Sequence, residues 1–488
     1  MILLAFPGLE TYRARPFPRY GSQHRHLREP EDHRIDIPEN ILVEHIEFFR
    51  EKILYYVPVI DDADLSDERH VIAYKRPLAY CASYVASQFI SGSTNVRQKL
   101  LAHVSEFLET IRGPLTQDGD KLWTQLQALA ILYAYCPPGE IFPLSGASQP
   151  VAALLDYYTL KSSVEAFAFR AGLHRSIDRL RIVVRGGASS DISKSSAFSM
   201  YVYWLWLVTM SHHFSVMTRT PPTLQEDSTT AVAFGFLRDI PRPPRVTRVL
   251  AEVDLQTLWR QAGRSAPGLS EWWCTPSDSI SVEGIVAVLE DLEGALEVWG
   301  IRWGLRGESN VTISNVDISK NGAVNFHFQA TRFFISAFAT RYILEKDRTA
   351  AVVEESTSSR GKILSPLGRE SVVKSFQAAH AFSRCLVDIS PLRRENVRYM
   401  GEFGYALIAF CCLYLVQLYE FFGTALQLPE SYMTSVEEVA AFMREMAIAN
   451  NITPRLYGNL VSQQVKQVLE GLSEHVDRDK TREFSASD

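Results

Sequence analysis

The chain has 488 residues, of which 46% are hydrophobic and 22% are charged, and this is the ordinary composition of a globular protein. The net charge of −6 argues against a protein that binds nucleic-acid phosphates over its own surface, because such proteins carry a basic excess. The first ten residues lack a basic segment and contain Pro7 and Glu10, so we expect no signal peptide.

Residues 1–37 show no sustained periodicity and are predicted to form a flexible tail. For His24, His26 and His33 we favour a solvated tail over a metal site, because a flexible segment offers no preorganised geometry. A helix is predicted over residues 38–53, which begin with a proline and carry apolar side chains on one face.

An acidic segment, Asp61-Asp62-Ala63-Asp64, follows this helix. Paired aspartates can hold Mg²⁺ for diphosphate chemistry, and in an all-helical, aromatic-rich chain they suggest an enzyme of the terpene-synthase type. That motif needs an acidic residue where the chain has Leu65, and no second metal motif follows. We therefore favour an acidic loop ahead of a helix and keep the all-helical enzyme as an alternative.

Three predicted helices in the middle of the chain end at clear stop signals. Residues 123–138 (WTQLQALAILYAYCPP) and 201–222 (YVYWLWLVTMSHHFSVMTRTPP) each run into a double proline. Between them, residues 164–175 (VEAFAFRAGLHR) carry apolar side chains at helical spacing, with Gly172 near the end of the pattern. The order of these elements is more informative than any one of them.

This order resembles the regulatory domain, or middle homology region, of fungal zinc-cluster transcription factors. The matching segments are Gln127-Ala128-Leu129, Arg170-Ala171-Gly172-Leu173-His174-Arg175, Trp204-Leu205-Trp206 and Arg219-Thr220-Pro221. The spacing after Arg170 is shorter than in the family, and Thr218 stands where the family has a glycine. By order of elements the resemblance covers residues 40 to 470.

The resemblance implies a large, multi-helix regulatory domain over residues 38–270. A C-terminal helical part over residues 271–474 would pack on it, and residues 475–488, which are charged and rich in serine, would form a disordered tail. It also implies a nuclear regulator of RNA polymerase II genes, with this chain as the effector-sensing domain and not an enzyme.

Family members bind DNA through six closely spaced cysteines that hold zinc. The six cysteines here are widely scattered, with no pair separated by two residues, so we expect no zinc or other cofactor in this chain. DNA contact would then require a zinc-cluster module that this sequence lacks, or a partner protein.

The residues that carry the resemblance are expected to have packing roles, with contact to a small-molecule effector as the alternative. They are Arg170, Gly172, His174, Trp204, Trp206, Arg219 and Pro221. No catalytic, cofactor or metal-binding residue is predicted, because no known enzyme motif is intact. His212 and His213 are adjacent and would point about 100° apart on a helix, so they are poor candidates for sharing a metal ion.

A second apolar pattern repeats in steps of three and four after Ser281. Its members are Val282, Ile285, Leu289, Leu292, Leu296 and Trp299. This is a coiled-coil seam of about two and a half heptads, shorter than a firm coiled coil needs. Packing inside the chain is favoured, and a homodimer through this seam, on a helical scaffold without a ligand, is the alternative.

Helices are predicted over residues 325–346, 368–388 and 396–427, and two more follow from about 435. Residues 405–416 (YALIAFCCLYLV) are too short an apolar run to span a membrane and are predicted to be a buried core helix. Because no convincing pair of strands is found, the predicted fold class is all-α.

Overall fold

The computed structural model describes residues 37–135, 155, 157–186, 192–225, 227–238, 240–273, 281–305, 322–354, 364–389, 391–449 and 451–485. Within these ranges the chain is built of helices and contains no strand; one isolated bridge joins Ile448 and Asn451. The all-α prediction is confirmed. The predicted tail over residues 1–37 lies outside the described residues, except for Ile37.

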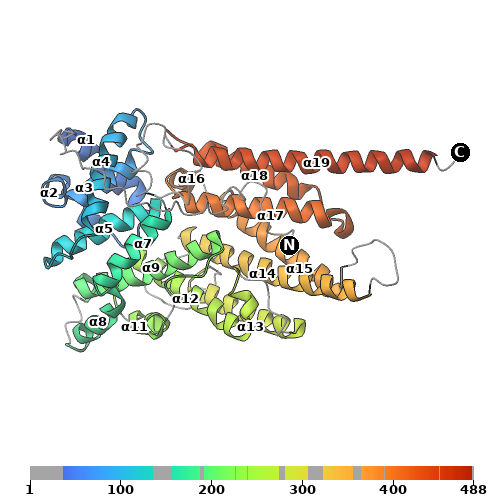
Figure 1. Cartoon of the computed structure of the whole chain (residues 1–488), viewed down its shortest axis with the longest axis horizontal. Helices are drawn as coiled ribbons and strands as arrows, with labels where there is room; N and C mark the ends of the chain where they lie inside the picture. Colours follow the sequence, from blue (N-terminus) through green and yellow to red (C-terminus); the bar gives the residue numbers. More distant parts are fainter. Residues whose placement is uncertain are drawn as a thin grey trace, which may run out of the picture.

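The N-terminal helices pack as a layer at one end of the molecule (Figure 1). They are α1 (Glu39–Phe48), α2 (Glu68–Tyr74), α3 (Arg76–Ala86), α4 (Thr94–Thr110) and α5 (Gly119–Tyr135). Helix α3 connects this layer, because it packs on each of the other four helices, α1, α2, α4 and α5. It lacks long charged side chains after its first residue and is buried over most of its length, so neighbours can approach it on several sides.

Six further helices are described in the middle of the chain, between its gaps at residues 136–154 and 274–280. They are α7 (Tyr157–Arg170), α8 (Ser176–Arg185), α9 (Ser196–Thr218), α10 (Ser228–Ala231), α11 (Ala233–Leu237) and α12 (Pro244–Ser265). Gly172 follows α7 in the left-handed conformation with φ 73°, which is the usual way for a helix to end. The predicted stop at this glycine is therefore confirmed.

Helix α9 is apolar on every side and lies at the centre of the molecule. Its first turn is capped by Ser195, whose hydroxyl accepts the Phe198 N–H at 3.2 Å. It ends at Arg219, which takes the left-handed conformation with φ 54°. A helix without a polar face has to be surrounded, and α9 packs against both α8 and α12.

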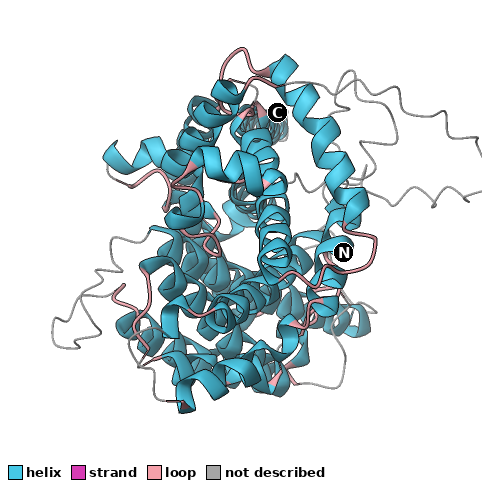
Figure 2. Ribbon diagram, turned by 90° about the vertical axis from the view of Figure 1, so that its left-hand side faces the viewer, coloured by secondary structure: helices cyan, strands magenta, loops and turns pink. Residues whose placement is uncertain are grey.

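The C-terminal helices form the other end of the molecule, where α17, α18 and α19 run side by side above α14 and α15 (Figure 1). The bounds are α13 (Val282–Arg302), α14 (Gly322–Glu354), α15 (Pro366–Arg384), α16 (Pro391–Val397), α17 (Glu402–Leu426), α18 (Ser431–Met446) and α19 (Thr453–Ser485). Figure 2 views the molecule along its longest axis, from the end that carries the N-terminal helices.

A single hydrophobic core runs through the described residues, from Ile37 to Val468. The two parts predicted for residues 38–270 and 271–474 thus share one core. Helix α19 continues to Ser485, through most of the segment that the sequence predicts to be a disordered tail. Charged residues without an apolar stripe can extend a helix whose earlier turns are already fixed, because adding a turn is much easier than starting one.

Helix α17 is the one described helix whose length and composition would let it cross a membrane. In its most apolar window, 67% is buried inside the protein. Length and composition alone are weak evidence of a membrane span, and burial of this kind is typical of the central helix of a globular core.

The predicted coiled-coil seam faces the interior of the chain. Ile285, Leu292, Leu296 and Trp299 are buried, while Val282 and Leu289 are half-buried against the same core. Helix α13 is further fixed to α12 by Asp254, which accepts hydrogen bonds from Arg302 Nη1 and Trp303 Nε1, both at 3.0 Å. Packing inside the chain, the favoured interpretation, accounts for the seam, and its buried members offer no free surface to a second copy.

The crossing of α18 and α19 depends on Gly458. A Cβ atom at this position would lie 2.5 Å from the Ala440 carbonyl oxygen, which belongs to a backbone that cannot move aside cheaply. Gly471 lies on the same helix, where a Cβ atom would meet no other atom within 4 Å. The two glycines therefore provide a matched pair.

We predict that Gly458→Ala lowers the free energy of unfolding by about 1–3 kcal/mol through overpacking. Gly471→Ala should leave it unchanged or raise it by up to about 1 kcal/mol, because alanine is the better helix former. Urea unfolding followed by circular dichroism measures both. Equal effects from the two substitutions would contradict the close α18–α19 crossing.

Candidate functional site

Arg170 holds the loop after α4 against the end of α7. Its guanidinium donates to the carbonyl oxygens of Ile111, at 3.2 Å, and Gly113. Both partners are backbone acceptors, and the side chain is spread over the surface and not directed into a cavity. The contact gives Arg170 a structural role.

His174 and Trp204 are brought together by the fold. Their ring centroids lie 6.2 Å apart, and the ring of Phe169 lies 5.4 Å from His174 and 5.6 Å from Trp204. Trp206 faces another side of α9, where it packs edge-on against Tyr133 at 6.1 Å. These aromatic contacts join the turn at Gly172 to α9.

The remaining residues of the resemblance, Arg219 and Pro221, lie beyond the C-terminal end of α9. Fifteen helical residues separate positions 204 and 219, which corresponds to roughly 22 Å along the helix axis. The residues selected from the sequence therefore do not converge on one site. Trp204 and Trp206 lie near the middle of α9, whereas Arg219 and Pro221 follow its C-terminal end.

The acidic segment is used for local capping and ion pairs. The Asp61 and Asp64 side chains form a reciprocal capping box around the short 3-10 turn η4 (Asp62–Asp64). Asp61 also pairs with Arg245 Nη2 at 2.5 Å, and Asp62 pairs with Arg50 Nε at 3.5 Å. The acidic-loop interpretation accounts for these carboxylates, since their nearest partners are protein cations and backbone amides.

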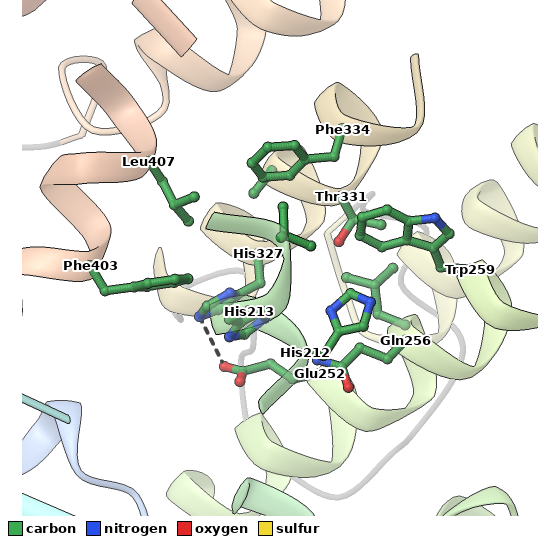
Figure 3. Close-up of a pocket in the computed structure, with 13 residues that line it drawn as sticks. His212, His213, Glu252, Gln256, Trp259, His327, Thr331, Phe334, Phe403 and Leu407 are labelled. Carbon is green, nitrogen blue, oxygen red and sulfur yellow. Dashed lines mark ion pairs between the residues drawn. The ribbon is translucent and has the colours of Figure 1, made fainter. Parts of the chain in front are cut away.

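A different group of side chains converges at the middle of the molecule. His213 comes from α9, Glu252 from α12 and His327 from α14, and the three meet beside a small cavity (Figure 3). One ligand atom from each lies within 4.8 Å of the other two. We call these three residues the His-Glu-His cluster.

The carboxylate of Glu252 connects the cluster. Its Oε1 atom lies 3.2 Å from His327 Nε2 and accepts a hydrogen bond from Arg248 Nε at 2.9 Å. Arg248 in turn donates from Nη1 to the Tyr55 carbonyl oxygen at 3.1 Å. Because Glu252 is 5% exposed and Arg248 11% exposed, this is a buried ion pair that also reaches the N-terminal helices.

The imidazole rings of His213 and His327 are stacked. Their centroids lie 4.7 Å apart with an angle of 5° between the planes, and Phe403 of α17 stacks on the other side of His213 at 5.3 Å. Next to them, His212 packs against Trp259 at 4.9 Å and Trp272 at 5.1 Å. The cluster is thus enclosed by aromatic rings.

Burial keeps these histidines neutral. It lowers the pKa of His213 and of His327 to about 3, and the pKa of His212 well below its ordinary value. A depressed pKa contributes stability that is present above the unfolded value of about 6.5 and is lost as the pH falls toward the folded value. The cluster therefore favours folding at neutral pH and opposes it in acid.

The cavity beside the cluster has a volume of about 20 Å³ and is bounded by His212, Gln256, Thr331 and the cluster itself. A water molecule needs roughly 10–15 Å³, so the space admits a water molecule or a single ion. It cannot hold an organic effector in this arrangement of the helices. His212 Nδ1 is buried here without a hydrogen-bond partner in the described chain.

His212 and His213 can be recognised in the sequence, whereas Glu252 and His327 cannot. The two adjacent histidines diverge, as expected on a helix, since His212 turns toward Trp259 and His213 toward His327. The partners of His213 belong to two other helices. No spacing in the sequence could have connected them, although Arg248 and Glu252 at i, i+4 are a recognisable helical ion pair.

No protein family, curated protein or solved structure matches the chain.

We predict that Glu252→Leu lowers the free energy of unfolding by roughly 3–5 kcal/mol, because it leaves the buried Arg248 cation without its counter-ion. The double substitution Arg248→Leu/Glu252→Leu should recover most of that loss, since it removes both charges together. Denaturant unfolding of the wild type, both single variants and the double variant measures the coupling. If the two single losses simply add in the double variant, the ion pair does not have the role assigned to it.

Proposed function

We propose that the chain is the effector-sensing, helical regulatory domain of a fungal transcriptional regulator of the zinc-cluster type, acting in the nucleus. The observation that carries the proposal is the order of the three central elements, with Gln127, Arg170 to Arg175 and Trp204 in matching places. DNA would be reached through a zinc-cluster module outside this sequence or through a partner protein.

The packing of these elements is compatible with such a role. The ring of His174, which follows the turn at Gly172, contacts the indole of Trp204 in the N-terminal half of α9. Nearer the C-terminal end of α9, where His213 lies, the His-Glu-His cluster joins α9 to α12 and α14. A helix held at both places can transmit a shift in packing from one half of the domain to the other, which is what a regulatory domain with two arrangements requires.

An organic effector would need a larger space than the central cavity. An open hollow of about 460 Å³ lies between α14 and α15, within the size range of small-molecule sites. Its lining includes Asn325, Gln329, His380 and Arg384. These polar groups could orient a small polar molecule, so this hollow is the better place for one.

The alternatives have less support. An enzyme of the terpene-synthase type needs free carboxylates at the mouth of a large apolar cavity, whereas Asp61 and Asp62 pair with arginines. A dimeric scaffold through α13 would need the seam residues at the surface, whereas Leu292 and Trp299 are buried. A regulatory domain requires neither feature.

We predict that the chain alters transcription when it is brought to a promoter. The chain is fused to a bacterial DNA-binding domain in a fungal host, and a reporter with the matching operator is measured against the DNA-binding domain alone. A several-fold change in either direction is expected. An unchanged reporter, with the fusion present in the nucleus at the same level, would contradict the proposal.

A matched pair of variants shows whether the effect needs the folded motif. Gly172→Val forces a branched residue into the left-handed conformation, at a cost of roughly 1–2 kcal/mol, and should alter the reporter response. Gly186→Val is the control, because Gly186 follows α8 with an ordinary φ of −71°. If both variants give the same reporter response, the response does not depend on the conformation at Gly172, and the central motif is not its source.

A further inference from the structure

We propose that His213, Glu252 and His327 bind a divalent first-row transition-metal ion, with Zn²⁺ as the best match. Two imidazoles and one carboxylate are an established ligand set for zinc, with a water molecule in the fourth position. The proposal concerns binding by the purified chain, and it does not depend on a role in transcription.

The spacing of the ligand atoms is close to what an ion requires. At zinc-ligand distances of about 2.0–2.2 Å, the ligand atoms of a tetrahedral site lie roughly 3.4 Å apart. His327 Nε2 and Glu252 Oε1 are already 3.2 Å apart, and all three ligand atoms lie within 4.8 Å. A contraction of about 1 Å by the third ligand would therefore close the site.

One ring has to turn for the ion to bind. The lone pair of an imidazole lies in the plane of its ring, and the parallel rings of His213 and His327 do not share a plane. Rotation of one ring about its χ2 angle brings both lone pairs toward a common point. The adjoining cavity of about 20 Å³ gives the ring, and a metal-bound water molecule, the necessary space.

Two independent features of the same cavity favour an occupant. The histidines are buried and neutral, which is the form that binds metals, so the ion does not have to displace an imidazolium proton. At His327 the proton that faces Glu252 from Nε2 has to move to Nδ1, which is a change of tautomer. His212 is 7% exposed, and its Nδ1 atom lacks a partner in the described chain. A water molecule in the adjoining cavity, which His212 also lines, would supply that partner, since buried polar atoms are rarely left unpaired.

Arg248 is expected to lower the affinity of the His-Glu-His cluster for a metal cation. Its positive charge lies against Glu252 Oε1 and opposes a dication at the same carboxylate. Arg248 Nε and His327 Nε2 both contact Oε1, so the carboxylate has to turn until Arg248 holds one oxygen and the ion the other. Such an outer partner then fixes the orientation of the ligand. We therefore expect weaker binding than at a site of the same ligands without a neighbouring cation.

The test is titration of the chelator-treated full chain with ZnCl₂ by calorimetry, together with the visible spectrum of the Co²⁺-loaded protein. The wild type should bind one ion per chain, and Co²⁺ should show the absorption of a tetrahedral site. Glu252→Gln, His213→Phe and His327→Phe should each weaken binding by at least about tenfold. Phenylalanine preserves the stacked ring while removing the ligand atom, so circular dichroism should show that these variants remain folded.

Two further variants serve as controls. His380→Phe removes a histidine outside the cluster, whose Nε2 atom contacts Ser435 at 3.0 Å, and should leave binding unchanged. A triple His24→Ala/His26→Ala/His33→Ala variant removes the histidines near the N-terminus and should also bind normally. Absence of binding by the wild type, or binding that is lost in the triple variant and retained in His327→Phe, would overturn the proposal. Neither result would bear on the promoter experiment.

Discussion

The ion pair between Arg248 and Glu252 is the interaction on which the centre of this protein depends. It places a cation and an anion inside a core that is made mostly of aromatic and aliphatic side chains. Such a pair is stabilising only while both charges and their hydrogen bonds are satisfied. Here the partners are Tyr55 from the N-terminal layer and His327 from α14, so three parts of the chain have to be in place together.

This constraint connects the fold to its proposed role. Helix α9 is surrounded on all sides. Trp204 contacts the ring of His174 in its N-terminal half, and Arg219 ends the helix in the left-handed conformation. Between them, His213 is the point at which α9 meets the polar cluster. A core with a polar centre is sensitive to whatever changes the charge at that centre, which makes the cluster a suitable place for an ion to act on the domain.

The sequence predicts those features that depend on neighbouring residues. The helix stop at Gly172 is an example, because capping is decided within a few residues. The all-α class follows from helical periodicity along the whole chain. The His-Glu-His cluster could not be predicted, because its members are far apart in sequence and meet only through tertiary packing. The extension of α19 to Ser485 was missed for a different reason, since a polar helix has no apolar stripe to reveal it.

The most direct test of the buried cluster is the pH titration of the side chains by NMR, in protein carrying ¹⁵N-labelled histidine. His213 and His327, assigned by their phenylalanine variants, should remain neutral from pH 7 down to about pH 5, because burial lowers the pKa of each to about 3. The Nε2 atom of His327 should carry the proton that faces Glu252. Titration of both rings near pH 6.5, as in solvent-exposed histidines, would show that the cluster is open to water and would contradict this description of the core.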